Sequence, residues 1–283
     1  MSDRRPSSTC LLAMHAASCV AMQPLDTIKV GLQTQGASKS HLGVWSCMRQ
    51  VVVEQGARAL WRGTVPSLGV AVISHQLWRK NGTLPDLGFF VQPQFQSESL
   101  DMAFTTAIAI TPLQVLKCRL QHVQGRPGVL QCVEGIVWES GMRGFFRGLS
   151  ARIAYNLVGT VGVAASLMAG MLLTWRNAKR QREPVRAETL RALSVATFAV
   201  GFGLSLPFDV LATRLQTMPP SGGRLRQSWS AEALAVLTQH GLRGFFAGGT
   251  ASLLSSACGL AAGILAFKAF DTPSTSRTPV YSC

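Results

Sequence analysis

The sequence predicts an all-α membrane protein with six transmembrane helices in three pseudo-threefold repeats, each with a short amphipathic helix between its two spans. Three observations predict this class: the spacing of the charged residues, a proline-containing motif that occurs three times, and a pair of glycines after each copy. We expect a single domain over residues 1–283, with repeat one at 8–96, repeat two at 97–184 and repeat three at 185–274.

Long windows without any charged residue separate the charged stretches of the chain. They span residues 6–25, 63–78, 102–116, 153–175, 192–208 and 244–267. A helix needs about 20 residues to cross a hydrocarbon core of about 30 Å, and the shorter windows reach that length if charged end residues snorkel. The windows therefore predict six spans, although buried helices of a soluble protein would give the same pattern.

The chain is strongly basic, with 27 basic and 13 acidic residues and a net charge of +14. Such a chain is attracted to nucleic acid, anionic lipid or anionic solutes. The basic residues are spread over all the loops and form no compact basic and aromatic stripe, so we expect lipid and no nucleic acid. The loop from Arg176 to Arg191 is as basic as the others, and the orientation of the spans stays undetermined.

The sequence shows no sign of an enzyme. Its seven cysteines are an odd number without a Cys-x-x-Cys pair and indicate neither a disulfide framework nor a zinc site. We find no catalytic cluster and no phosphate-binding glycine loop in the sequence. We therefore expect no cofactor and no metal. Residues 1–6 have no secretory signal or long transit helix, and we expect no cleavage there.

A ten-residue segment, Pro24–Gln33, has two counterparts, Pro112–Gln121 and Pro207–Gln216. Each copy is followed by two glycines at a constant spacing. These are Gly56 and Gly63, Gly141 and Gly148, and Gly241 and Gly248. The segments between motif and glycines carry apolar residues at helical spacing, which suits short surface helices. Repetition of both elements predicts a unit of helix, amphipathic segment and helix.

These residues resemble the signature of the mitochondrial carrier family (solute carrier family 25). That signature is Pro-x-acid-x-x-base-x-base-x-Gln, then acid-Gly, four residues and aromatic-base-Gly, once per repeat. The chain is similar to a divergent member from about Thr9 to Asp271. The resemblance implies a monomeric, multi-pass transporter of the mitochondrial inner membrane that works by alternating access. It also implies helix kinks at Pro24, Pro112 and Pro207, and short amphipathic helices on the matrix side.

The resemblance further implies a gate of ion pairs where the proline-containing helices converge. In the order of the expected pairs, the gate positions hold Asp26 and Lys117, Asp209 and Lys29, and Gln114 and Ala212. The third pair has lost both charges, and an unpaired ion in a membrane interior is costly. We expect a weakened matrix gate with two ion pairs. Glutamine braces are expected one turn further on, at Gln33, Gln121 and Gln216.

Family members contact their substrate mainly from the even-numbered helices, about two turns beyond the aromatic-base-Gly element. The corresponding candidates are Val70, Ala71, Tyr155, Asn156, Ser255 and Ser256, and none is charged. Arg152 is a further candidate, which we interpret preferentially as a structural or lipid contact. The third repeat is similar to that of carriers of small dicarboxylates. The resemblance thus leaves a small metabolite, either a dicarboxylate or an amino-acid-like solute.

Cardiolipin sites are implied at the N-termini of the even-numbered helices. The candidates are Trp61, Arg62, Gly63, Phe146, Arg147, Gly148 and Gly248. Backbone amides at a helix N-terminus bind phosphate well. In the third repeat Ala247 stands where the family has a basic residue, so that site is incomplete.

The opposite gate of the family is eroded in this chain. Phe270 and Asp271 match its motif without the base, and Asp86 lies near the equivalent place in repeat one. Two interpretations therefore stay open: a transporter, or a degenerate carrier that serves as a non-transporting scaffold or receptor. The retained gate charges favour transport, because a scaffold needs no breakable closure. His15 and His75 are candidates for proton coupling, with a packed histidine as the favoured interpretation.

Overall fold

The computed structural model describes residues 8–34, 43–80, 100–122, 128–181, 187–217 and 228–271, and every regular element among them is a helix. The long helices are α1 (Ser8–Thr34), α3 (Thr64–Lys80), α5 (Leu100–His122), α7 (Leu149–Gln181), α8 (Ala187–Thr217) and α10 (Gly249–Asp271). The expected all-α class is confirmed for these parts of the chain. Pro24, Pro112 and Pro207 lie inside α1, α5 and α8.

A twelve-residue helix and a short 3₁₀ helix separate the two long helices of each unit. They are α2 (Val44–Gln55) and η2 (Ala57–Trp61), α6 (Val129–Ser140) and η4 (Gly141–Phe146), and α9 (Trp229–His240) and η5 (Leu242–Phe246). The same order of elements therefore occurs three times along the described chain.

Three glycines fix the contacts between successive units. Gly63, Gly148 and Gly248 have φ angles of 84°, 71° and 74°, a region that strongly favours glycine. A Cβ atom at Gly63 would lie 3.2 Å from Lys117 Cγ on α5, and one at Gly148 would lie 3.1 Å from a carbonyl oxygen of α8. A Cβ at Gly248 would lie 3.2 Å from the Lys29 carbonyl oxygen on α1. Each unit thus packs closely on the proline-containing helix of the next.

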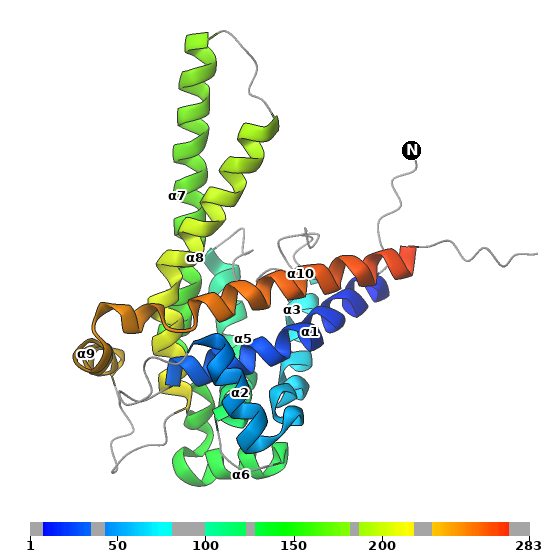
Figure 1. Cartoon of the computed structure of the whole chain (residues 1–283), viewed down its shortest axis with the longest axis vertical. Coiled ribbons are helices and arrows are strands. Elements are labelled where there is room, and N and C mark those ends of the chain that lie inside the picture. The colour runs from blue at the N-terminus through cyan, green and yellow to red at the C-terminus, as the bar shows by residue number, and fades with distance from the viewer. Residues whose placement is uncertain are drawn as a thin grey trace, which may run out of the picture.

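The long helices pack in pairs, α1 with α10, α3 with α5, and α7 with α8 (Figure 1). Further contacts join α1 to α3 and α5 to α7, and the three proline-containing helices also touch one another. Each short helix packs an apolar face on the proline-containing helix of its own unit. Fully buried Ile28, Ile136 and Val236 lie in these three small clusters. The interior between the long helices is instead rich in polar side chains.

Two expectations about element length are wrong. α7 continues to Gln181 and α8 begins at Ala187, so much of the basic stretch expected as a loop is helical. Figure 1 shows these two helices extending well beyond the rest of the bundle. Asp86 lies outside the described residues, and the side chains of Phe270 and Asp271 are not described, so the opposite gate has no structural account.

Two helical segments of the described chain are long and apolar enough to cross a membrane, Val195–Thr217 and Leu242–Ala266. The expected count of six spans therefore stays a prediction. In α1 and α5, buried polar and charged residues interrupt the apolar sequence, which lowers the mean hydropathy of these helices.

Candidate functional site

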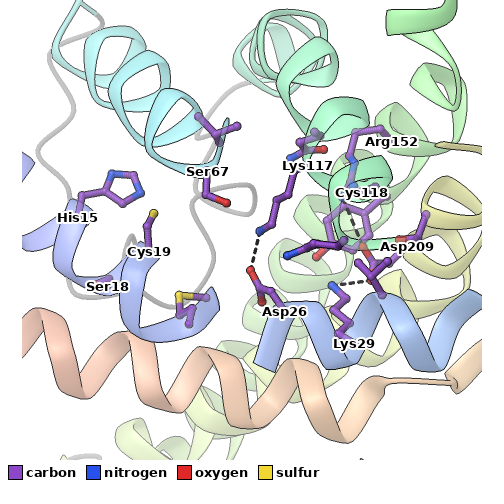
Figure 2. A pocket seen from close by; sticks show the side chains of 17 residues that line it. His15, Ser18, Cys19, Asp26, Lys29, Ser67, Lys117, Cys118, Arg152 and Asp209 are labelled. Carbon is purple, nitrogen blue, oxygen red and sulfur yellow. Dashed lines mark hydrogen bonds and ion pairs between the residues drawn. The ribbon is translucent and has the colours of Figure 1, made fainter. Parts of the chain in front are cut away.

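A cavity of about 150 Å³ lies between α1, α3, α5, α7 and α8. Its lining is mixed, with polar side chains from all five helices. The charged residues that line it are Asp26, Lys29, Lys117, Arg152 and Asp209. Figure 2 shows that these five side chains gather in one part of the cavity, while His15, Ser18 and Cys19 lie along α1 away from them.

The first ion pair joins α1 to α5. Lys117 Nζ lies 2.6 Å from Asp26 Oδ2, and Ser255 Oγ on α10 donates a hydrogen bond of 2.6 Å to Asp26 Oδ1. Both charged side chains are about one-fifth exposed. The Asp26 carboxylate therefore links its own helix α1 to α5 and to α10. Both contacts are charge-assisted, because the carboxylate is the acceptor in each.

A larger cluster surrounds Asp209 on α8, whose side chain is 3% exposed. Lys29 Nζ on α1 lies 2.7 Å from Asp209 Oδ2, and Gln33 Nε2 donates to the same oxygen at 2.8 Å. The other oxygen lies 3.4 Å from Arg152 Nη1 on α7. The Arg152 guanidinium also lies over the Tyr155 ring, 5.3 Å from its centre. One carboxylate thus serves two cations and an amide.

The third expected pair of positions holds no charge. Gln114 on α5 is 6% exposed, and Ala212 on α8 is fully buried. Gln114 Oε1 has no hydrogen-bond partner among the residues that the structure describes. Leaving a buried amide oxygen without a donor costs free energy. Gln33 Oε1 and Gln121 Oε1 share this feature within the described residues, but Gln114 alone of the three stands at a gate position.

The three expected glutamine braces differ in what they contact. Gln33 donates to the Asp209 carboxylate, as described above. Gln121 Nε2 donates to Thr27 Oγ1 at 3.2 Å, and Gln216 Oε1 accepts a weak hydrogen bond from Cys118 Sγ at 3.4 Å. Of the three, Gln33 alone contacts an ion-paired carboxylate.

The expected substrate contacts are divided between cavity and helix interior. Val70, Arg152 and Tyr155 line the cavity. Asn156, Ser255 and Ser256 are buried and lie outside its lining, although Ser255 reaches it indirectly through the Asp26 carboxylate.

Arg152, for which the sequence favoured a structural or lipid contact, makes a contact inside the protein. Its side chain is buried, lines the cavity and pairs with Asp209 across two helices. The corresponding residues of the other units, four positions after Gly63 and Gly248, are Ser67 and Ser252. The sequence could have indicated a special role for Arg152, because an arginine stands where the other two repeats have serine.

Seven further cavity residues were not predicted as site residues: Ser18, Cys19, Met22, Val30, Ser67, Cys118 and Thr213. They lie on α1, α3, α5 and α8, and their residue types alone do not mark them as site residues. His15 also lines the cavity, and His75 is buried on α3.

The lipid-site candidates lie around the 3₁₀ helices. Trp61 and Phe146 are 47% and 43% exposed, and Arg62 Nη1 donates to Gln55 Oε1 at 2.5 Å. Burial lowers the pKa of Arg147 from its ordinary value, and the like charge of Arg119 adds to the effect. An arginine nevertheless keeps its proton, so Arg147 is positively charged.

Two more ion pairs fasten the short helices to the proline-containing helices. Arg119 Nη1 lies 2.5 Å from Glu139 Oε2 of α6, and Arg214 Nη1 lies 3.7 Å from Glu232 Oε1 of α9. Arg214 Nε also donates to the Gln33 carbonyl oxygen at 2.8 Å. None of these four charged side chains lines the cavity.

Comparison with known proteins gives consistent matches. A family profile described as "Mitochondrial carrier protein" matches residues 5–78 and 102–172. A probable mitochondrial 2-oxodicarboxylate carrier of Schizosaccharomyces pombe is 25% identical over 234 residues, covering 78% of this chain and 77% of the relative. The human mitochondrial carnitine/acylcarnitine carrier protein is 28% identical over 269 residues, or 87% and 86% of the two chains. The human mitochondrial glycine transporter is 25% identical over 251 residues, or 82% and 77%. These relatives have different solutes in their names.

Proposed function

Because the chain belongs to the mitochondrial carrier family, we propose that α1, α5 and α8 form the closed gate of a transporter that works by alternating access. The chain is a solute transporter and not an enzyme, and it is a multi-pass protein of the mitochondrial inner membrane. One observation carries the proposal: the ion pairs Asp26–Lys117 and Lys29–Asp209 join α1 to both other helices where all three line the cavity.

Ion pairs suit a closure that has to open and close. A charged side chain inside a membrane protein is stable when it is paired or when it faces water. In the closed arrangement the pairs replace hydration, and when the helix ends separate, water reaches both partners. The two states can therefore be close in free energy, which an alternating-access cycle requires.

In this proposal the six long helices span the membrane as three repeats, over residues 8–96, 97–184 and 185–274. The threefold order of elements and the three interlocking glycines support it. With a rise of 1.5 Å per residue, the 17 residues of α3 extend about 26 Å and the 33 residues of α7 about 50 Å. α3 then needs snorkelling ends, while α7 projects beyond the hydrocarbon core.

Cardiolipin is the proposed lipid partner, held at the starts of α3, α7 and α10. Exposed Trp61 and Phe146 beside Arg62 and Arg147 support two such sites. The third lacks the basic residue, because Ala247 stands there. A monomer is the proposed working state, since the cavity lies within one chain.

The names of the relatives support a small metabolite as solute, and they differ in the charge class of that solute. The alternative of a non-transporting scaffold gains no support from the site, because both expected ion pairs are formed.

Charge reversal in liposomes tests the gate. Asp26→Lys and Lys117→Asp should each lower transport about tenfold or more, since each places two like charges in contact. The double variant should recover part of the rate, with the Ser255 hydrogen bond to Asp26 as the reason that recovery is incomplete. Uptake is measured with whichever solute of a panel of carboxylates, amino acids and nucleotides the unaltered protein transports fastest.

The matched control exchanges Arg119 and Glu139, an ion pair outside the cavity lining. That exchange should leave the ratio of transport rates among solutes unchanged. Harmless single changes at Asp26 and Lys117, together with no recovery in the double variant, would show that this pair is not a gate.

A further inference from the structure

We propose that the transported solute is a small monoanion that also bears an uncharged hydrogen-bonding group, such as a hydroxy-monocarboxylate. The inference rests on the proposed transport function and names the substrate class of the same cavity. Two observations carry it: the balance of fixed charges around the cavity, and the buried amide of Gln114.

The described residues that line the cavity carry one excess positive charge. Lys29, Lys117 and Arg152 are basic, and Asp26 and Asp209 are acidic, so the balance is 3 − 2 = +1. Each acid lies within 2.7 Å of a lysine nitrogen, which favours the ionised form of both partners. His15, Tyr155 and the two cysteines of the lining are counted as neutral.

The excess is located at Asp209. Asp26 and Lys117 form a pair that is balanced in charge. Lys29 and Arg152, by contrast, share the single carboxylate of Asp209, at 2.7 Å and 3.4 Å. A second carboxylate near these two cations would complete the charge balance. We therefore place the anionic group of the solute beside Lys29 and Arg152, where a guanidinium has donors enough for more than one carboxylate.

Charge balance then discriminates among solutes. When the transport cycle closes the cavity around the solute, uncompensated charge in the resulting low-dielectric space is costly. A monoanion brings the sum to zero. A dicarboxylate brings it to −1, and a zwitterion or a neutral solute leaves it at +1.

Gln114 supplies the second recognition element. It lines the cavity, is more than nine-tenths buried, and its Oε1 has no hydrogen-bond partner within the described parts of the chain. The residues at the two equivalent positions, Asp26 and Asp209, are both fully engaged. A hydroxyl or N–H group of the solute would satisfy this amide, which a buried polar group requires. The solute therefore carries such a group in addition to its single charge.

The test uses the full chain in liposomes and solutes matched in carbon number. The panel contains a hydroxy-monocarboxylate, an unsubstituted monocarboxylate, a dicarboxylate, an α-amino acid and a polyol. We expect the hydroxy-monocarboxylate to be taken up fastest, with the dicarboxylate and the amino acid slower by about tenfold or more. Preferred uptake of the dicarboxylate, the amino acid or the polyol overturns the proposal.

Three variants separate charge from hydrogen bonding. Gln114→Glu lowers the charge sum to zero and should shift preference from the monoanion to the amino acid or polyol by about tenfold. Gln121→Glu makes the same change elsewhere in the lining and should shift preference the same way. Gln114→Met removes the amide only, so discrimination against the dicarboxylate should remain while the hydroxylated and unsubstituted monocarboxylates become equal. Glu54→Gln, an exposed change on α2, is the control for lost or gained charge outside the cavity.

Each outcome decides the proposal. Unchanged charge selectivity in both glutamate variants overturns it, and if Gln114→Glu fails to fold, Gln121→Glu decides alone. If folded protein transports no solute of the panel, the proposed transport function fails separately. The substrate class is then judged by thermal unfolding, because a ligand of the folded state raises the midpoint. Stabilisation by the hydroxy-monocarboxylate above the others supports the class, and its absence rejects it.

Discussion

The contact between α1 and α8 differs sharply from the contact between α5 and α8. At the first, Asp209 receives Lys29 and Gln33 from α1 and Arg152 from α7. At the second, the gate positions hold Gln114 and Ala212, which form no ion pair. The three contacts between the proline-containing helices therefore differ in strength, although the repeats are similar. We expect the ends of α5 and α8 to separate most readily, with α1 and α8 as the more firmly joined pair.

The largest expected effect is that of Asp209→Asn. The change leaves Lys29 and Arg152 buried without the carboxylate that they share, and breaking a buried pair in this way costs about 3–5 kcal/mol. Thermal unfolding in cardiolipin-containing detergent measures it. Glu139→Gln is the comparison. Glu139 is 39% exposed although its partner Arg119 is 7% exposed, so water reaches this pair and the loss of stability should be smaller. Equal loss of stability in the two variants would contradict the view that Asp209 is the shared partner of two buried cations.

A smaller effect is expected from building the missing ion pair, with Gln114→Glu and Ala212→Lys together. The two changes cancel in charge, so preference among solutes of different charge should not change. Because Ala212 is fully buried in an apolar cluster outside the cavity lining, folding of the double variant is checked first by thermal unfolding. A third pair should strengthen the α5–α8 contact, and a coupling of about 1–2 kcal/mol would slow turnover by about tenfold. The measurement is the rate of turnover at saturating solute. Faster turnover in the double variant would contradict the view that the missing ion pair weakens the α5–α8 contact.

The smallest expected effect is the difference in stability between two glutamine variants. Gln33→Leu removes a hydrogen bond to a carboxylate, worth about 1.5–3 kcal/mol. Gln121→Leu removes one to the Thr27 hydroxyl, worth about 1 kcal/mol. Chemical or thermal unfolding of the two variants should therefore show the greater loss for Gln33→Leu. The reverse order would mean that bracing is stronger at the α1–α5 contact.

The sequence predicted what local motifs determine. Repetition of the proline motif and the glycine pair predicted the helical units, because both depend on positions along the chain. The residues that meet in the two ion pairs followed from the family resemblance, since each pair joins two different helices. The partner of Arg152 was not predicted, since its contact with Asp209 depends on how α7 is rotated against α8. The different partners of Gln33, Gln121 and Gln216 likewise depend on how closely the helices approach. The extent of α7 and α8 was not predicted, because the basic composition of residues 176–191 is compatible with a loop and with an exposed helix.

The most direct test of the central claim uses Cys19, which lines the cavity, as the sole cysteine of the protein in liposomes. A membrane-impermeant maleimide is added at the face that carries α2, α6 and α9, or at the opposite face. Lys29→Gln removes the α1–α8 ion pair while Asp209 keeps Arg152 as its partner, so the variant should fold. If the ion pairs close this face, labelling from it should be slow in the unaltered protein and about tenfold faster in Lys29→Gln, with labelling from the opposite face unchanged. Equal labelling from both faces, unaffected by Lys29→Gln, would contradict the gate.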